Sequence, residues 1–95
     1  MIQGFADRRT KRFFQEGRCP AAWRAFERVA LRKLDMIDAA VTLADLKVPP
    51  GNRLETLKGD RAGQNSIRIN DQWRICFRSM EDGPIDVQIV DYHRG

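Results

Sequence analysis

The carboxyl-terminal sequence DVQIVDYHRG places three side chains with acid–base or stacking chemistry next to one another. Asp91 supplies a carboxylate, Tyr92 is the only tyrosine of the chain, and His93 is the only histidine. Cleavage of RNA by its own 2′-hydroxyl needs a base, an acid for the departing 5′-oxygen, and a cation that stabilises charge on phosphorus. Because an imidazole changes its charge near neutral pH, it can take either proton role. This cluster is therefore a candidate site for RNA cleavage.

A single histidine limits the mechanisms that such a site can use. A mechanism with two histidines is excluded, so the second proton carrier must be a carboxylate or Tyr92, or else electrostatic stabilisation supplies most of the rate. The structural alternative is that His93 is a solvated surface residue and that Tyr92 covers the edge of the core.

Arginines precede this cluster at even positions of the sequence. Arg68, Arg74 and Arg78 alternate with apolar residues, so we expect them on the sheet face opposite the core, looking outward. A planar guanidinium binds phosphate oxygens two at a time, and a basic outward sheet is a plausible platform for RNA. The alternative is that these arginines solubilise the strands and that Asp86 pairs with one of them across the ladder.

The same alternation predicts the strands that would position these groups. Three runs place apolar residues at odd positions and would face one core: Ile67 and Ile69, then Trp73, Ile75 and Phe77, then Ile85, Val87 and Ile89. The segments NDQ (70–72) and MEDGP (80–84) supply turns, which predicts an antiparallel meander. The run RLETL (53–57), after the break at Pro49, Pro50 and Gly51, is suited to a further strand.

Two helices are predicted before these strands. Asp7 is a potential N-cap for the segment RRTKRFFQE, which would end at Gly17. Pro20 opens a longer helix, in which apolar residues recur at steps of three or four. This stripe comprises Trp23, Phe26, Ala30, Leu34, Ile37 and Val41. Residues 1–5 can form a short additional strand.

Length and composition indicate one domain. Ninety-five residues with 42% hydrophobic content support a single core, so we expect one domain over residues 1–95. Two helices followed by three or four antiparallel strands predict an α+β fold in which both helices cover the odd face of the sheet.

The basic charge balance favours a polyanionic partner. The formal net charge is +4 and the isoelectric point is about 9.6. The longer helix carries a basic face, which is either an anion site or, more commonly, a solvated surface: Arg24, Arg28, Arg32 and Lys33. With no membrane-length apolar stretch and no signal peptide, the protein is expected in the cytoplasm. Cys19 and Cys76 lack metal-ligand spacing and are expected to be unpaired thiols.

The stretch NRLETLKGDRAGQNSIRINDQWRICF, followed by DVQIVDYH, resembles the HigB toxins, the plasmid maintenance system killer proteins of the RelE/ParE superfamily. The resemblance extends over nearly the whole chain. It implies a curved antiparallel sheet with two helices, and an endoribonuclease that cleaves translated mRNA in the ribosomal A site and inhibits growth. It also implies a HigA-type helix-turn-helix antitoxin, through which alone the toxin would meet operator DNA, and no metal or organic cofactor.

The resemblance also implies roles for particular residues. Asp91, Tyr92 and His93 match the family's C-terminal active-site motif, with His93 as general acid, Asp91 orienting it or acting as base, and Tyr92 stacking on a base. Lys58 and Arg74 would stabilise the phosphorane, and the RNA-binding set would be Arg61, Arg68 and Arg78. Some relatives carry a further histidine three residues before the lysine. Glu55 stands there in this chain and is a candidate base.

Two rival functions remain open at this point. ParE-type relatives share the implied fold but poison DNA gyrase, which needs no acid–base cluster. The other rival is a non-nucleolytic member that acts by binding the ribosome, or a member with much-reduced nuclease activity, and the presence of Glu55 in place of histidine keeps this alternative open. The surface that contacts an antitoxin is equally open, since the basic helix residues Arg24, Arg28 and Arg32 are as suitable as the sheet face.

Overall fold

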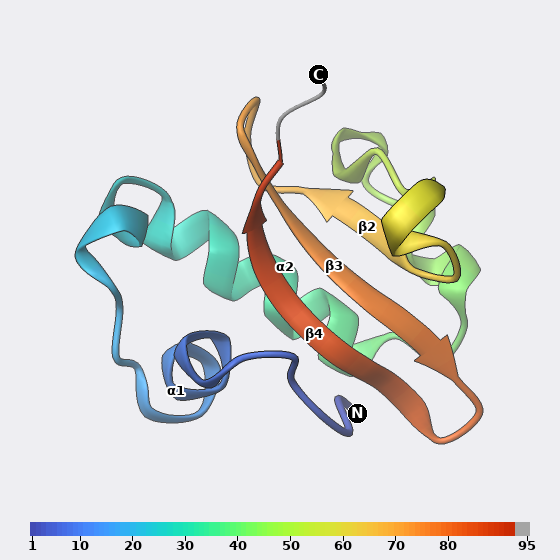
Figure 1. Ribbon diagram of the computed structural model, residues 1–95, viewed down its shortest axis with the longest axis horizontal. Coiled ribbons are helices and arrows are strands. Elements are labelled where there is room, and N and C mark those ends of the chain that lie inside the picture. Colours follow the sequence, from blue (N-terminus) through green and yellow to red (C-terminus); the bar gives the residue numbers. More distant parts are fainter. Residues whose placement is uncertain (93–95) are drawn as a thin grey trace.

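The computed structural model describes residues 1–92 and contains a four-stranded sheet in the order β1-β2-β3-β4 (Figure 1). The strands are Glu55–Thr56 (β1), Asn65–Arg68 (β2), Trp73–Met80 (β3) and Gly83–Asp91 (β4). Every neighbouring pair is antiparallel. The predicted α+β class and antiparallel meander are therefore confirmed, although the RLETL segment contributes only two strand residues.

The first helix, α1 (Arg8–Glu16), begins and ends where the sequence predicts. The Asp7 carboxylate accepts a hydrogen bond from the Thr10 backbone N–H at 2.7 Å, which satisfies one of the unpaired donors of the first turn. Gly17, at φ 70°, ends the helix in a left-handed conformation that costs glycine little. Residues 1–5 do not form the expected strand. They make an isolated β-bridge, in which Phe5 pairs in parallel with Val87.

The longer predicted helix is divided into two elements. Ala21–Phe26 form a 3₁₀ helix, η1, and the α-helix α2 follows from Glu27 to Ala39. Most of the predicted apolar stripe is buried: Trp23, Phe26, Ala30, Leu34 and Ile37. The prediction for Val41 was wrong, because α2 ends before it and its side chain is 90% exposed. No helix within residues 1–92 is long and apolar enough to cross a bilayer.

The core lies between the helices and one face of the sheet. α2 crosses behind the sheet, and α1 lies beside β4 (Figure 1). Both layers contribute buried side chains, among them Phe13, Trp23, Leu34, Ile37, Ile67, Ile75, Phe77, Val87 and Ile89. The rings of Phe13 and Trp23 meet edge to face with centroids 5.4 Å apart. Burying each large apolar side chain contributes about 1.5–3 kcal/mol, so this layer supplies most of the fold's stability.

A β-bulge in β4 reverses the predicted alternation at one end of the sheet. The pairing passes from Cys76 opposite Gln88 to Arg78 opposite Ile85, so β4 has one extra residue between these pairs. Asp86, within the bulge, has φ 53°. An inserted residue turns every side chain beyond it to the other face. Ile85, predicted on the core face, therefore lies on the face of Arg78.

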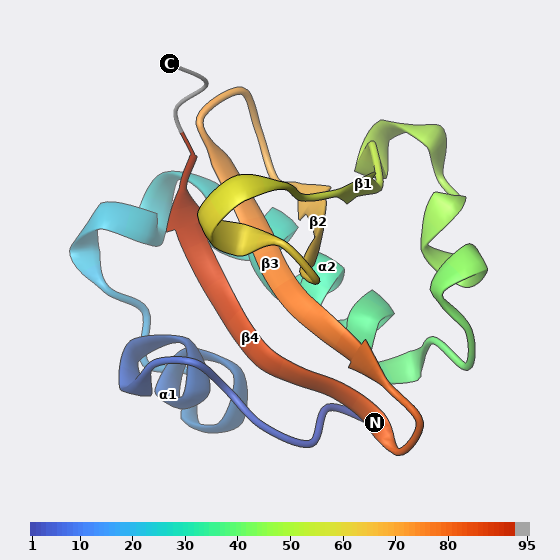
Figure 2. The same ribbon diagram turned by 45° about the vertical axis from the view of Figure 1, so that its right-hand side comes forward.

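The face opposite the helices is not an open platform, in contrast to the prediction. Residues 57–64, which include the 3₁₀ helix η4 (Gly59–Arg61), lie in front of the sheet while α2 lies behind it (Figure 2). Leu57 and Cys76 are buried on this side, and burial raises the pKa of the Cys76 thiol. Gly63 packs so closely that a Cβ added there would lie 2.6 Å from Nη1 of Arg78. Both cysteines are unpaired, as expected.

The connection from α2 to the sheet holds a buried lysine. It contains the 3₁₀ helices η2 (Leu43–Lys47) and η3 (Pro50–Asn52). Lys33, predicted on a solvated basic face, is instead buried, and its Nζ donates to Oδ1 of the buried Asn52. Desolvation lowers the pKa of Lys33, and the charges of Arg32 and Arg68 lower it further. The Asn52 amide donates in turn to the Leu46 carbonyl, at 3.2 Å.

Candidate functional site

A cleft of about 400 Å³ lies where the β2–β3 turn and the end of β4 meet. Among the described residues, it is lined by Arg53, Glu55, Arg68, Asn70, Asp71, Arg74 and Tyr92. These residues come from the start of β1, the end of β2, the β2–β3 turn, the start of β3 and the chain just after β4, all at one end of the sheet. Three guanidiniums therefore meet two carboxylates, an amide and a phenol in one hollow.

Four residues that the sequence singled out come together in this cleft. Glu55 and Arg74 enter from β1 and β3, Arg68 from the end of β2, and Tyr92 from the chain after β4. Antiparallel pairing explains their meeting, since Arg68 lies opposite Arg74 and Glu55 lies opposite Ser66. The cleft thus offers a carboxylate and an aromatic ring beside two cations, which suits a phosphodiester with an adjacent base.

Arg74 does not look outward as predicted. Only 7% of its surface is exposed. Its Nε donates to Oγ of Ser66 at 2.8 Å, and its Nη2 donates to the carbonyls of Arg53 at 2.5 Å and Ser66 at 3.3 Å. These charge-assisted bonds hold the guanidinium at the base of the cleft. They also connect Arg53, just before β1, with Ser66 in β2. Arg74 therefore stabilises the fold as well as lining the candidate site.

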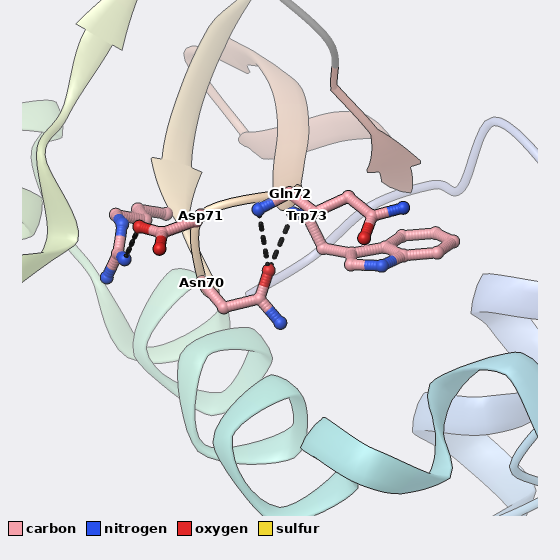
Figure 3. Close-up of polar contacts among 5 residues, drawn as sticks. Asn70, Asp71, Gln72 and Trp73 are labelled. Carbon is pink, nitrogen blue, oxygen red and sulfur yellow. Dashed lines mark hydrogen bonds and ion pairs between the residues drawn. The ribbon is translucent and has the colours of Figure 1, made fainter.

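The turn between β2 and β3 is fixed by its own side chains. Oδ1 of Asn70 accepts hydrogen bonds from the backbone N–H groups of Gln72, at 2.9 Å, and Trp73, at 2.8 Å (Figure 3). Asp71 forms an ion pair with Arg68 across the turn, with 2.5 Å between Oδ1 and Nη2. The segment NDQ predicted a turn and nothing more, and the structure shows that Asn70 and Asp71 also line the cleft.

Asp91 and Tyr92 are held by the same turn. Nε2 of Gln72 donates to Oδ2 of Asp91 at 3.0 Å, and the Gln72 carbonyl accepts from the Tyr92 N–H at 2.8 Å. Asp91 is exposed at the end of β4, and Tyr92 is half-buried and lines the cleft. His93 lies outside the described residues. Gln72, which the sequence did not single out, therefore links the turn to Asp91 and Tyr92.

The remaining predicted cations lie on the segment that covers the sheet or beneath it. Lys58 is exposed just before η4 and Arg61 donates to Oε1 of Gln64 at 3.1 Å. Arg78 donates to the Ala62 carbonyl at 3.4 Å and forms an ion pair with Asp86, also at 3.4 Å. The alternative in which Asp86 pairs with a strand arginine is thus confirmed. Of the described residues that line the cleft, none belongs to this group.

Two further hollows lie elsewhere on the described part of the chain. One of about 220 Å³ is lined by Arg9, Arg12, Arg18, Cys19 and Pro20 beside α1. The other, of about 240 Å³, lies beside the β3–β4 hairpin and includes the exposed side chains of Met1, Val41 and Met80. Neither contains a predicted catalytic residue. Arg24, Arg28 and Arg32 are exposed on η1 and α2, as expected of a solvated or binding surface.

Residues 3–93 match the model of a family described as the RelE-like toxin of the type II toxin–antitoxin system HigB. The chain is 39% identical to Toxin HigB-1 of Vibrio cholerae serotype O1 over 98 aligned positions, which cover 99% of both chains. It is also 38% identical over 66 positions to an uncharacterized protein of Haemophilus influenzae, covering 70% of this chain and 64% of that protein.

Proposed function

Because the chain belongs to the HigB family of RelE-like toxins of type II toxin–antitoxin systems, we propose that it inhibits growth by cleaving translated mRNA in the ribosomal A site. The observation that carries the proposal is the cleft in which Glu55, Arg68, Arg74 and Tyr92 meet. Phosphodiester cleavage by an internal hydroxyl requires a base, a cation beside the phosphate and an acid for the leaving oxygen. The carboxylate and the guanidiniums of the cleft can supply the first two, and we assign the third to His93.

The proposed reaction is a displacement at phosphorus. Glu55, or Asp91, accepts the proton of the 2′-hydroxyl, and the 2′-oxygen forms a bond to the adjacent phosphorus. The bond from phosphorus to the 5′-oxygen breaks, and His93 gives its proton to that leaving oxygen. The products are a 2′,3′-cyclic phosphate and a free 5′-hydroxyl. Each positioned proton carrier contributes typically 10²–10⁴-fold to such a rate.

Cations stabilise the extra charge that develops on the phosphoryl oxygens. Arg74 is held by Ser66 and the Arg53 carbonyl, so its charge is already in place before the substrate binds. Lys58 is proposed as a second cation that reaches the phosphorane from the segment before η4. Tyr92 would stack on a base of the mRNA, and Arg61, Arg68 and Arg78 would contact its backbone.

A type II toxin has an antitoxin partner. We assign to this chain an antitoxin of the HigA type, with a helix-turn-helix domain through which alone the toxin would meet operator DNA. The ribosome and mRNA are the proposed targets, and the cytoplasm, where translation takes place, is the proposed site of action. The reaction as written needs no metal ion or organic cofactor.

The test is translation of a defined mRNA in a purified bacterial system, with mapping of the new 5′ ends. We expect cuts at A-site codons with the unmodified protein and none with His93→Ala. Glu55→Gln is expected to slow cleavage about 100-fold if Glu55 is the base. Translation that stops on an intact message would refute cleavage and favour the non-nucleolytic ribosome-binding function. Inhibition of supercoiling in the same extract would favour action on gyrase.

A further inference from the structure

The ion pair between Arg68 and Asp71 lies in the wall of the cleft. Both residues line the hollow, and one carboxylate oxygen of Asp71 lies 2.5 Å from Nη2 of Arg68. The turn that carries Asp71 is fixed by Asn70, whose Oδ1 accepts hydrogen bonds from the N–H groups of Gln72 and Trp73 (Figure 3). The carboxylate is therefore presented to Arg68 by a defined turn rather than by a free loop.

The exposure of the two side chains shows which partner is on the outside. The Asp71 side chain is fully exposed, whereas 32% of the Arg68 side chain is exposed. A carboxylate that supported the guanidinium from behind would be the more buried of the two. Asp71 is instead the outer partner, on the side that solvent reaches. Exposed ion pairs are held weakly, so another anion can replace this carboxylate at little cost.

Arg68 differs in this respect from its strand neighbour Arg74. The Arg74 guanidinium is buried and bonded to Ser66 and to the Arg53 carbonyl, which are parts of the fold. The pKa of buried Lys33 is lowered mainly by desolvation, and the positive charge of Arg68 contributes after that of Arg32. Two cations near one another favour an anion beside Arg68. Asp71 supplies it in this structure, and a phosphate would satisfy the same field.

We propose that Asp71 is the resident counter-ion of a phosphate subsite at Arg68, and that a phosphate of single-stranded RNA displaces it on binding. The proposal rests on the proposed function, because RNA is the ligand. It adds a residue that sets the affinity of the cleft: Asp71 competes with the substrate for Arg68. The carboxylate also marks where that phosphate lies, within reach of Nη2 of Arg68.

The experiment measures binding of a fluorescently labelled single-stranded RNA to five proteins by anisotropy. Four of them are the unmodified chain, Asp71→Asn, Arg68→Gln and the double variant. Asp82→Asn is the matched control, because Asp82 is exposed in the β3–β4 turn and the substitution changes the net charge equally. We expect Asp71→Asn to tighten binding about two- to fivefold, Asp82→Asn to change it less, and Asp71→Asn to have no effect once Arg68 is glutamine.

Three results would overturn the proposal. Equal tightening by Asp71→Asn with and without Arg68 would mean that only net charge matters. Tightening no greater than that of Asp82→Asn would mean the same. Weaker binding would make Asp71 a support that orients Arg68. Cleavage in the purified translation system tests the proposed function separately. A protein that binds RNA with the expected pattern but leaves mRNA intact would refute the proposed cleavage, whereas the proposed role of Asp71 as counter-ion of Arg68 would stand.

Discussion

Arg74 illustrates, at the scale of single residues, how one side chain can serve both the fold and the candidate site. From its place in the sequence, Arg74 is predicted to bind the scissile phosphate, and its side chain does line the cleft. Its bonds to Ser66 and to the Arg53 carbonyl join β3 to β2 and to the chain just before β1. Loss of activity in an Arg74 variant would therefore not by itself demonstrate catalysis, and stability must be measured alongside it.

We expect Arg74→Lys to lower the free energy of unfolding by about 1–3 kcal/mol. A lysine keeps the charge but cannot present the planar fork that reaches three acceptors, so buried carbonyls lose their donors. Urea denaturation measures the change. Arg78→Lys is the matched control on the same strand and should change stability by less than about 0.5 kcal/mol, because Arg78 is partly exposed. Equal effects of the two substitutions would contradict the structural role of Arg74.

Lys33 predicts a specific dependence of stability on pH. Its pKa in the folded protein is lowered from the usual 10.5, mainly by desolvation. Between the lowered value and 10.5 the unfolded chain binds more protons than the folded one, so the free energy of unfolding rises with pH in that window. Below the window the cost of burying the charge is fully present.

Lys33→Met should remove this contribution. Relative to the variant, the unmodified chain is expected to gain stability between neutral pH and about pH 10.5. Urea denaturation at several pH values gives the difference, from which titrations common to both proteins cancel. Lys47→Met, at an exposed lysine, serves as the control for the loss of one positive charge. If the difference in the free energy of unfolding between the Lys33 variant and the unmodified chain stayed constant with pH, the lowered pKa of Lys33 would be refuted.

At the scale of elements, the bulge in β4 decides which side chains each end of the sheet presents. The extra residue near Asp86 keeps Val87 and Ile89 in the core but turns Ile85 to the other face. It also places Asp86 next to Arg78, with 3.4 Å between their charged atoms. The positive φ of Asp86 makes the bulge sensitive to the type of residue there.

Asp86→Val is expected to lower the free energy of unfolding by about 1–2 kcal/mol, because a β-branched residue is strained at φ 53°. Asp86→Gly is the comparison variant. It also loses the ion pair with Arg78 but adopts the left-handed conformation readily, so its effect should stay within about 1 kcal/mol. Thermal or urea unfolding distinguishes the two. If the valine variant were as stable as the glycine variant, the bulge would not impose the conformation.

At the scale of the whole molecule, the positive charge is distributed over several surfaces. Arg68 and Arg74 lie in the cleft, Arg78 lies beneath the segment 57–64, and the arginines of α1, η1 and α2 occupy the helical side. A net charge of +4 favours association with RNA in general. Which of these surfaces contacts the polyanion is measurable from the dependence of binding on salt.

The logarithm of the RNA association constant decreases linearly with the logarithm of the salt concentration. For each phosphate contact that is removed, the magnitude of this slope should decrease by about 0.7 for single-stranded RNA. We expect this decrease for Arg68→Gln and for Arg78→Gln, measured by titrating a single-stranded RNA at several salt concentrations. An unchanged slope for either variant would limit that arginine to its contacts within the protein. The ion pair with Asp86 and the bond to the Ala62 carbonyl are such contacts for Arg78.

The sequence by itself determined the features that depend on residues close together in the chain. The Asp7 cap, the Gly17 end of α1 and the core positions of Ile67, Ile75 and Phe77 depend on local patterns, so capping rules and periodicity predicted them. The resemblance assigned Glu55, Arg74 and Tyr92 to the active site and Arg68 to RNA binding, and the structure places all four in one cleft.

Only the tertiary structure decided which polar side chains are buried and what surrounds the cleft. Lys33 is buried because the distant Asn52 supplies an acceptor, and Arg74 because Ser66 and the Arg53 carbonyl do. Periodicity places a side chain on a face but carries no information on what covers that face, because the covering residues come from elsewhere in the chain. The segment 57–64 over the sheet and the Asp71 carboxylate beside Arg68 are consequences of such long-range packing.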